Sequence, residues 1–552
     1  MLFRIRLLLM VAAVAVAIPH SAHAQASLVK SIASPASPTP RCGGPTQAYV
    51  LTMLRDSGWV DLRSRADREI TGACLDSLVN SGSKGRPVEI IGARVKDGFD
   101  VNFAEVNVAV ILRATTFAGM VRFENSRFRW NVVLDSSTFE GPVDFRGTTF
   151  EAALSLNGAE FRAGLNGFHA RVGGDFEAMG TIFRGDVDFR GLAVKGDARF
   201  DSITAGRFDA SRGAYEGDVV FTNSWFVGPD AIVNLERATI KQTLFLNSLD
   251  TVAPLVNLVY TDVGYSLGAN GTVWGDSVKM RGMRTGMHLD LRHGRFEDPL
   301  ILRGAQVRGD LLLDSVVVTQ GAELDRASVT GTLSLRGSEF GGSLSLAEVD
   351  AGLLNITGVR RLPPPAAFSV DGLTFGHMES VVNGQSSPSA LLAFLGSARF
   401  SADAYGTLEG FFARHGEKRF ANRTLYERRA RERGGLPVLS RIGSILLNVT
   451  VRYGRLPALA FLWWALFVGL GMWVFSRAQL TLADPEKACC QRFDPLWYSL
   501  DTFLPMVDLK YADEWKLTRE NNRWPWLYLR FHTLMGWVLI PVALAAISGL
   551  LK

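Results

Sequence analysis

The chain has 552 residues, 47% of them hydrophobic, and its 59 basic and 54 acidic residues give a formal net charge of +5. A protein that imitates duplex DNA must have a strongly acidic surface, so this charge balance argues against such a mimic. With only four cysteines, the composition fits an exported membrane protein, and the length suits one long repetitive domain with small appendages.

Residues 1–24 have the pattern of a secretory signal peptide. Arg4 and Arg6 precede an apolar run from Leu7 to Ile18, and Ala22-His-Ala24 has the small residues of a cleavage site. An uncleaved anchor is the alternative interpretation. The pattern predicts export, so we expect no nucleic acid among the partners.

Residues 25–83 are predicted to form a linker and a small helical cap. The linker is rich in Ser, Pro and Ala, and Cys42 and Cys74 bracket the helical part. In an exported domain two cysteines most simply form one disulfide, which would hold the cap on the first turn of the following repeat. A buried pair of free thiols is the alternative.

Residues 84–361 follow an eleven-residue period. An apolar anchor starts each unit, two more apolar residues follow at +4 and +6, and Gly recurs at +2 and often at +8. The clearest anchors are Phe117, Phe128, Phe139, Phe150, Phe161, Val172, Phe183 and Val194. A right-handed coiled coil shares this period, but at about 100° per residue positions 0, +4 and +6 would point to opposite sides of a helix. In a strand, +4 and +6 share one face.

The period therefore predicts a mainly β fold, a single-stranded β-helix of 11-residue units with two units per turn. Stacked turns would join the inward side chains into one continuous core, so Phe145, Phe189 and Leu313 should be buried. About two dozen units predict roughly a dozen turns, each about 4.8 Å high.

Two runs in this region, Val187-Asp-Phe189-Arg-Gly and Ala198-Arg-Phe200-Asp-Ser, resemble the pentapeptide-repeat family in its degenerate bacterial form. The resemblance covers about half of the chain and implies a four-sided β-helix. It implies almost nothing about function, because a fold of this kind does not specify an activity.

Residues 362–455 are predicted to form a helical linker and hairpin. Leu362-Pro-Pro-Pro365 should end the solenoid, because consecutive prolines cannot donate to a β-ladder. One helix is expected before His415-Gly416 and a second from Glu417 onward. The second helix has a basic outer face, which is either solvated or in contact with anionic lipid headgroups. The candidate lipid-contacting residues are Arg428, Arg429, Arg431 and Arg433.

Residues 456–552 are predicted to form a membrane module. The runs 456–476 and 531–551 are each 21 residues without a charge, long enough to cross a bilayer as helices. Between them, residues 493–505 have the spacing of an amphipathic helix that lies in the membrane interface. The module resembles the C-terminal membrane part of some bacterial pentapeptide-repeat proteins.

The order of span, short helix and span also resembles the pore module of two-helix cation channels. Such a pore needs a ring of backbone carbonyls that a glycine-containing filter supplies. This chain has Phe503-Leu-Pro-Met-Val-Asp508 at that place, without the glycines. Ion conduction is therefore only an alternative hypothesis.

Two signals conflict over membrane topology. The signal peptide places the solenoid outside the cytoplasm, whereas Arg441, Arg452 and Arg455 before the first span favour a cytoplasmic position by the positive-inside rule. Long translocated domains often override that rule, so we predict a protein of the bacterial inner membrane with a periplasmic solenoid. The vicinal Cys489-Cys490 would then be cytoplasmic and reduced, without a chemical role.

No pattern in the sequence indicates catalysis, and we expect no catalytic, metal-binding or cofactor-binding residues. A glycan-active β-helix would need carboxylates clustered on adjacent turns. The outward row that contains Asp144, Asn166 and Asp188 shows no carboxylates at neighbouring positions of equal phase. The histidines have no metal-ligand spacing.

The leading hypothesis is a membrane-anchored, non-enzymatic scaffold that binds lipid through its anchor and an unknown protein or envelope partner through its solenoid. A homo-oligomer is possible. The second hypothesis is a channel-like or signalling membrane protein with the solenoid as its sensor. The third is a glycan-active β-helix enzyme.

Overall fold

The computed structural model describes residues 42–80, 86–251, 255–379, 381–382, 385–386, 388–483, 492–504, 507, 509–519 and 522–548. The predicted signal peptide, the linker that follows it and Cys489-Cys490 lie outside the described residues. The chain divides into two compact units, Met1–Phe245 with Val252–Pro254, and Leu246–Thr251 with Leu255–Lys552. Each unit is described by itself.

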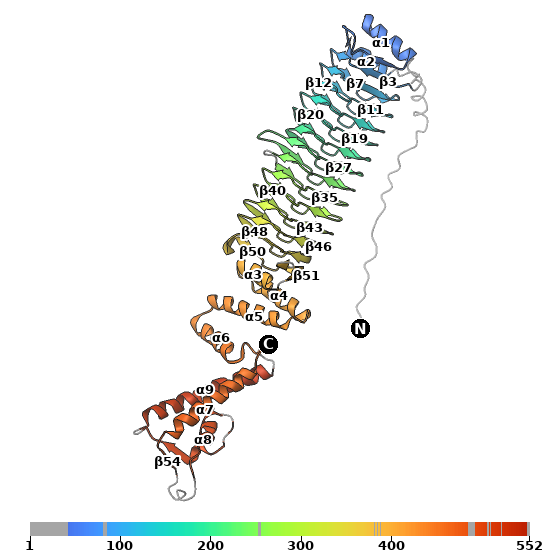
Figure 1. The fold of residues 1–552 in the computed structure, drawn as a ribbon. Coiled ribbons are helices and arrows are strands. Elements are labelled where there is room, and N and C mark those ends of the chain that lie inside the picture. The colour runs from blue at the N-terminus through green and yellow to red at the C-terminus, as the bar shows by residue number, and fades with distance from the viewer. Residues whose placement is uncertain are drawn as a thin grey trace, which may run out of the picture. The chain divides into compact units, whose positions relative to one another are not determined.

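The first unit is built from short parallel strands, four to a turn (Figure 1). One turn consists of β12 (Thr138–Phe139), β13 (Val143–Asp144), β14 (Thr149–Phe150) and β15 (Leu154–Ser155). Each strand pairs with its equivalent 22 residues later, as Phe139 does with Phe161. Four sides and two 11-residue units per turn are the architecture that the sequence predicts.

We number the four sides of a turn in chain order, starting from β12. Side 1 of this unit contains β2 (Glu69–Ile70), β4 (Arg94–Val95), β8 (Thr116–Phe117), β12, β16 (Glu160–Phe161), β20 (Ile182–Phe183), β24 (Thr204–Ala205) and β28 (Trp225–Phe226). Side 2 contains β5 (Phe99–Asp100), β9 (Val121–Arg122), β13, β17 (Leu165–Asn166), β21 (Val187–Asp188), β25 (Arg207–Asp209) and β29 (Ile232–Asn234).

The anchors form the core of this unit. On side 1 the rings of Phe117, Phe139 and Phe161 stack with centroids 4.9 and 4.5 Å apart, close to the spacing of neighbouring strands. Phe145 and Phe189 are each 1% exposed. The prediction that positions +4 and +6 face a common interior is confirmed.

Most units of the regular repeat turn a corner at the residue eight places after their anchor. Gly147 and Gly158 have φ near +64° there, but Asn125, Ser136 and His169 adopt the same left-handed conformation. This conformation is costly for a residue with a Cβ. The backbone N–H groups of these residues donate to the next turn, for example from Asn125 to the Arg146 carbonyl at 2.8 Å. The ladder of hydrogen bonds therefore offsets the local strain.

The cap consists of α1 (Pro45–Asp56) and α2 (Gly72–Asn80). It was predicted to be helical throughout, but Trp59 belongs to β1 (Trp59–Asp61), which pairs in parallel with β3 (Val88–Ile91). The side chains alternate between solvent and core as they do in a strand: Val60 is fully buried, between the exposed Trp59 and the half-buried Asp61. The ladder thus begins before residue 84.

The second unit continues the same repeat with an aliphatic core. One turn contains β40 (Arg295–Phe296), β41 (Leu300–Ile301), β42 (Gln306–Val307) and β43 (Leu311–Leu312), and Leu313 is fully buried as predicted. Counted over both units, the parallel β-solenoid has about 14 turns.

The triple proline does not end the solenoid, contrary to the sequence prediction. After η2 (Pro365–Ala367), β50 (Phe368–Ser369) pairs in parallel with β48 (Ser343–Ser345). Likewise β51 (Thr374–Glu379) pairs with β49 (Asp350–Asn355). The prolines lie in an inserted segment between two ladder strands, where no N–H is required. Together with β1 and β2, these strands explain why the turns outnumber the predicted dozen.

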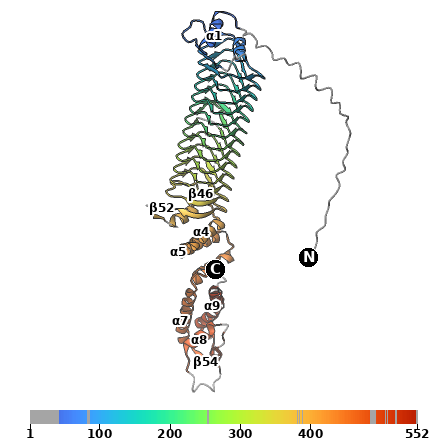
Figure 2. The same ribbon diagram turned by 90° about the vertical axis from the view of Figure 1, so that its right-hand side faces the viewer.

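Helices follow the solenoid in the second unit. These are α3 (Pro388–Ser397), α4 (Ala402–Arg414), α5 (Lys418–Glu432), α6 (Val438–Val451), α7 (Ala458–Ser476), α8 (Pro495–Phe503) and α9 (Arg523–Ile547). The α4–α5 hairpin turns at His415-Gly416, as predicted. β54 (Leu480–Leu482) and β55 (Trp515–Leu517) pair antiparallel between the long helices. Figure 2 shows α7, α8 and α9 side by side.

Candidate functional site

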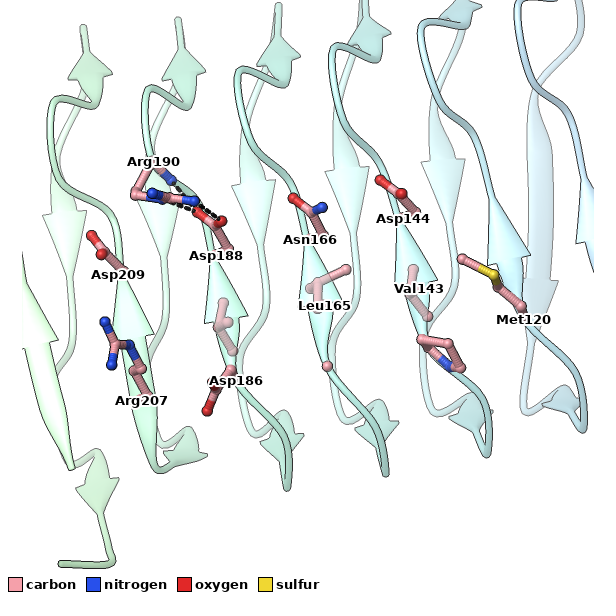
Figure 3. A pocket seen from close by; sticks show the side chains of 13 residues that line it. Met120, Val143, Asp144, Leu165, Asn166, Asp186, Asp188, Arg190, Arg207 and Asp209 are labelled. Carbon is pink, nitrogen blue, oxygen red and sulfur yellow. Dashed lines mark hydrogen bonds and ion pairs between the residues drawn. The ribbon is translucent and has the colours of Figure 1, made fainter. Parts of the chain in front are cut away.

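The outer surface of side 2 in the first unit has a row of polar side chains over an open cavity of about 550 Å³. Asp144, Asn166, Asp188 and Asp209 occupy equivalent positions on β13, β17, β21 and β25 (Figure 3). Each points outward because the neighbouring residue, such as Val143 or Val187, points into the core.

This row corrects one expectation from the sequence. Asp188 and Asp209 are direct register partners, so two carboxylates do lie at neighbouring positions of equal phase. They are 21 rather than 22 residues apart, because the repeat loses one residue near Thr204. A comparison at a constant spacing therefore misses the pair.

Two carboxylates of the row are paired with arginines. The Arg190 guanidinium lies 2.6 Å from Asp188, and the Arg146 guanidinium lies 2.8 Å from Asp144. Burial alone would raise the pKa of Asp188, but the hydrogen bonds donated by the side chain and N–H of Arg190 outweigh it and lower the pKa below its usual range. A general acid of glycoside hydrolysis needs a raised pKa instead. Asp188 therefore lacks the raised pKa of such an acid, and the row combines both signs of charge.

A second cavity, of about 500 Å³, lies beside the first and shares Arg190 with it. Phe168, His169, Arg212 and Glu236 line it, and the Arg190 guanidinium is 5.3 Å from the centre of the Phe168 ring. The residues that line the two cavities combine both signs of charge with one aromatic face. Such a composition suits contact with a polar partner.

Metal and cofactor binding were not expected from the sequence. Within the described ranges, no three His, Cys, Asp or Glu side chains come close enough together to hold a metal ion.

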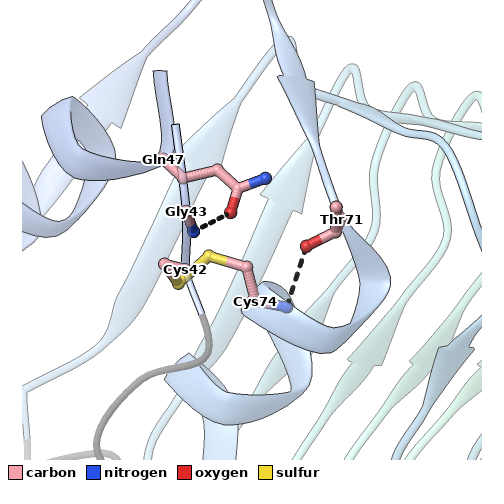
Figure 4. Close-up of a disulfide and its surroundings, with 5 residues drawn as sticks. All are labelled: Cys42, Gly43, Gln47, Thr71 and Cys74. Atoms are coloured by element: carbon pink, nitrogen blue, oxygen red, sulfur yellow. Dashed lines mark hydrogen bonds between the residues drawn. A yellow bond between two sulfur atoms is a disulfide. The ribbon is translucent and has the colours of Figure 1, made fainter. Parts of the chain in front are cut away.

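The cap has the disulfide that its two cysteines suggested. Cys42 and Cys74 are joined with their Cα atoms 4.6 Å apart (Figure 4). Nearby, Gly43 donates its N–H to Gln47 at the start of α1, and Cys74 donates to the Thr71 hydroxyl at the start of α2. The bond therefore fixes the start of the described chain to the helix that covers the first turns.

The basic residues of α5 make several contacts within the protein. Arg428 lies 3.8 Å from Glu409 of α4, and Arg429 lies 3.1 Å from Glu432. Arg431 donates to the carbonyl of Ala398 and lies over the Tyr405 ring. Arg433 opens the short turn η3 (Arg433–Gly435). Contact of these four arginines with lipid headgroups stays a prediction.

The spans of the sequence correspond to α7 and α9, the latter starting eight residues earlier than 531. Both are long and apolar enough to cross a membrane. The short helix α8 packs against both through Tyr498, Ser499 and Phe503, whereas Leu496 and Trp497 of its predicted apolar stripe are exposed. The position of α8 in the membrane interface stays a prediction.

Two glycines and a buried histidine position α8. A Cβ on Gly471 of α7 would overlap the Ser499 hydroxyl, and one on Gly536 of α9 would overlap the Phe503 carbonyl. His532 of α9 is fully buried, and its ring lies 3.2 Å from the Tyr528 hydroxyl and 3.0 Å from the Ser499 carbonyl. Sequence reasoning missed this cluster, although a histidine within an apolar span is a recognisable signal.

Comparison with known proteins bears on the solenoid. Residues 104–149 and 123–166 match the family model described as pentapeptide repeats (9 copies). The matched part of the solenoid is similar to pentapeptide repeats. The matched residues contain Asp144 and Asn166 of the polar row. Searches of the curated proteins and of the solved structures found no match.

Proposed function

We propose that this pentapeptide-repeat protein is a non-enzymatic scaffold, anchored in a membrane by α7 and α9, whose solenoid binds a protein or another component of the cell envelope. The proposal depends mainly on the exposure of the two long helices. Only 22% and 33% of the most apolar windows of α7 and α9 are buried. Leu462, Trp473 and Leu534 are 64%, 56% and 60% exposed. Lipid would remove this apolar surface from water.

The anchoring is tested by washing membranes with alkaline carbonate. The full chain should remain in the membrane fraction, whereas a chain that stops before residue 456 should be released. Release of the full chain would refute the anchoring. Residues 42–74 provide a test of sidedness, because a periplasmic cap should contain the oxidised Cys42–Cys74 pair before lysis and a cytoplasmic cap should contain free thiols.

The polar row of side 2 is the surface that we assign to partner binding. It presents Asp188 and Asp209 beside Arg190, so a partner with both charged and hydrogen-bonding groups would be complementary to it. A photo-crosslinking residue at Asn166, in the row, should form an adduct in cells. The same residue at Ser155, on side 4 of the preceding turn, is the matched control. Equal adducts at both positions would refute the assignment.

The lowered pKa of Asp188 argues against this carboxyl as the general acid of a glycan-cleaving site. Turnover of acidic polysaccharide by the purified chain that Asp188→Asn abolishes would overturn the non-enzymatic proposal.

A channel-like function is the second candidate, favoured by the packing of α8 against both α7 and α9. That arrangement places a short helix between two spans, as pore modules do. Reconstitution in planar bilayers decides between the two functions, because a scaffold gives no conductance. Conductance that disappears in Gly471→Leu, which would displace α8, would support the channel. Chemical crosslinking in the same membranes tests whether the chain is a homo-oligomer.

A further inference from the structure

Helix α6 (Val438–Val451) presents an unpartnered apolar face. Val438, Ile442, Ile445 and Val449 follow one another at i, i+4, i+7 and i+11 and are 70%, 59%, 45% and 50% exposed. This spacing places the four side chains on one side of the helix. Leu439, at the edge of the row, is 84% exposed. A soluble surface seldom has a helix with such a continuous apolar row.

The opposite face of α6 is attached to the two long helices. Val451 is fully buried in a cluster with Ala460 of α7 and with Ala543 and Ala546 of α9. The indole N–H of Trp463 donates to the Val449 carbonyl at 3.1 Å. These contacts fix α6 where α7 begins and α9 ends, which is the level at which a pair of spans leaves the membrane core.

The charged residues that flank α6 in the sequence are all basic, although one of them, Arg455, is paired with Glu409 of α4. Between Glu432 and Asp484 the sequence contains no Asp or Glu, but it contains Arg433, Arg441, Arg452, Arg455 and Arg477. Arg441 is exposed on α6 and donates to the main-chain carbonyls of Gly434 and Leu436, which carry no net charge. A basic residue beside an apolar row is the composition of helices that lie on anionic bilayers.

We propose that α6 lies in the plane of the membrane surface, with the Val438–Ile442–Ile445–Val449 row in the acyl boundary and Arg441 among the headgroups. The occupant of the face is lipid rather than a protein, because the face adjoins the ends of the two spans and is flanked by cations. This inference rests on the membrane anchoring proposed above. It assigns lipid contact to α6, a segment that the sequence did not single out, in addition to the α5 arginines.

Depth-dependent fluorescence quenching tests the proposal on the full chain. Cys489 and Cys490 are replaced by Ser, the Cys42–Cys74 disulfide is kept, and one new cysteine is labelled with an environment-sensitive fluorophore. The test position is Ile442→Cys. The matched control is Ser440→Cys, which is also exposed but lies about 160° away around the helix. Leu466→Cys on α7 reports on the span itself.

The labelled chains are reconstituted in vesicles of phosphatidylcholine and phosphatidylglycerol that contain lipids with a nitroxide at a shallow or a deep position. We expect the label at 442 to be quenched at least twofold more than that at 440, and most by the shallow nitroxide. We expect the label at 466 to be quenched most by the deep nitroxide. Equal quenching at 442 and 440, with 466 quenched, would overturn the proposal for α6 and leave the anchoring intact.

Two other outcomes are distinguishable from these. Absence of quenching at all three positions would refute the anchoring itself, and the inference about α6 with it. A label at 442 that is shielded from aqueous iodide but not quenched by lipid would show that protein covers the face, such as a second copy of the chain, and would also overturn the proposal. Replacing Arg441 by Ala should reduce quenching at 442 in anionic vesicles, whereas Arg441→Lys should preserve it.

Discussion

Replacing Phe139 by Ala should destabilise the turns around it strongly and locally. The Phe139 ring is fully buried and stacks 4.9 Å from Phe117 and 4.5 Å from Phe161. Truncation of a buried Phe to Ala costs about 3–5 kcal/mol, because the side chain loses its burial and leaves a cavity. At about 1.4 kcal/mol per factor of ten, the opening constant of these turns should rise by about 100-fold to 4,000-fold.

Hydrogen–deuterium exchange of the full chain measures this effect segment by segment. In a solenoid each turn contacts only its neighbours, so amides of β8, β12 and β16 should lose protection while those around Leu311 do not. Phe103→Ala is the matched control, because Phe103 is 75% exposed and its removal should change stability by less than about 0.5 kcal/mol. Equal losses in the two variants, or a loss spread evenly to Leu311, would refute the stacked-core reasoning.

Three further predictions concern other parts of the fold. Gly141→Ala would place a Cβ 2.7 Å from the backbone of the preceding turn and should destabilise the two turns by about 1–3 kcal/mol. Gly410→Ala in α4, where a Cβ has no neighbour within 4 Å, should instead stabilise the helix by about 0.5–1 kcal/mol. Hydrogen-exchange rates that change in the same direction in both variants would contradict this reasoning. Replacing Cys42 and Cys74 by Ser opens a 32-residue loop and should cost the cap about 3–4 kcal/mol, seen as faster proteolysis of α1 and α2 than in the oxidised protein. The lowered pKa of Asp188 means that its charge stabilises the folded state above the ordinary value of 3.8 and that this contribution is lost as the pH falls through the folded pKa. The stability advantage of the native chain over Asp188→Asn should therefore shrink as the pH falls below about 4, and a constant difference from pH 7 to pH 3 would contradict it.

The sequence predicted the core of the solenoid because each turn repeats the same inward positions. Phe145, Phe189 and Leu313 come from distant units, yet all three are at most 1% exposed. The sequence did not predict the pairing of Asp188 with Asp209, because one lost residue near Thr204 shifts every later outward position relative to a constant 22-residue count. The inward anchors still face the core after the loss of one residue, because the corner becomes one residue shorter. In the outward row, the same loss changes which residue stands beside Asp188 in the next turn.

The corner conformation was also only partly predictable. Gly at +8 indicated a tight corner, but His169, Arg212 and Arg237 take up the same left-handed backbone. Histidine is enriched at positive φ, but the residue type of Arg212 and Arg237 does not indicate it. For these two residues the aligned position in the repeat is the signal, because the hydrogen bonds to the adjacent turn hold the backbone in this conformation.

The membrane module shows a different limit of sequence reasoning. Charge-free length was sufficient to predict α7 and α9, whereas the buried face of α8 depends on two notches, Gly471 and Gly536, on helices far away in the sequence. The face of α6 was missed because Ser, Gly and Asn interrupt its apolar residues along the chain. Only the helical arrangement brings Val438, Ile442 and Ile445 into one row.

One polar contact joins the hairpin to the start of the membrane module. The Glu409 carboxylate of α4 lies 2.5 Å from the Arg455 guanidinium, just before α7, and 3.8 Å from that of Arg428. The side chains of Glu409 and Arg428 are only 18% and 21% exposed. Water can therefore replace the carboxylate beside these arginines only at a cost. Contact of Arg428 with a lipid headgroup would compete with this ion pair, and it stays a prediction. The same carboxylate therefore attaches the α4–α5 hairpin to the segment between α6 and α7.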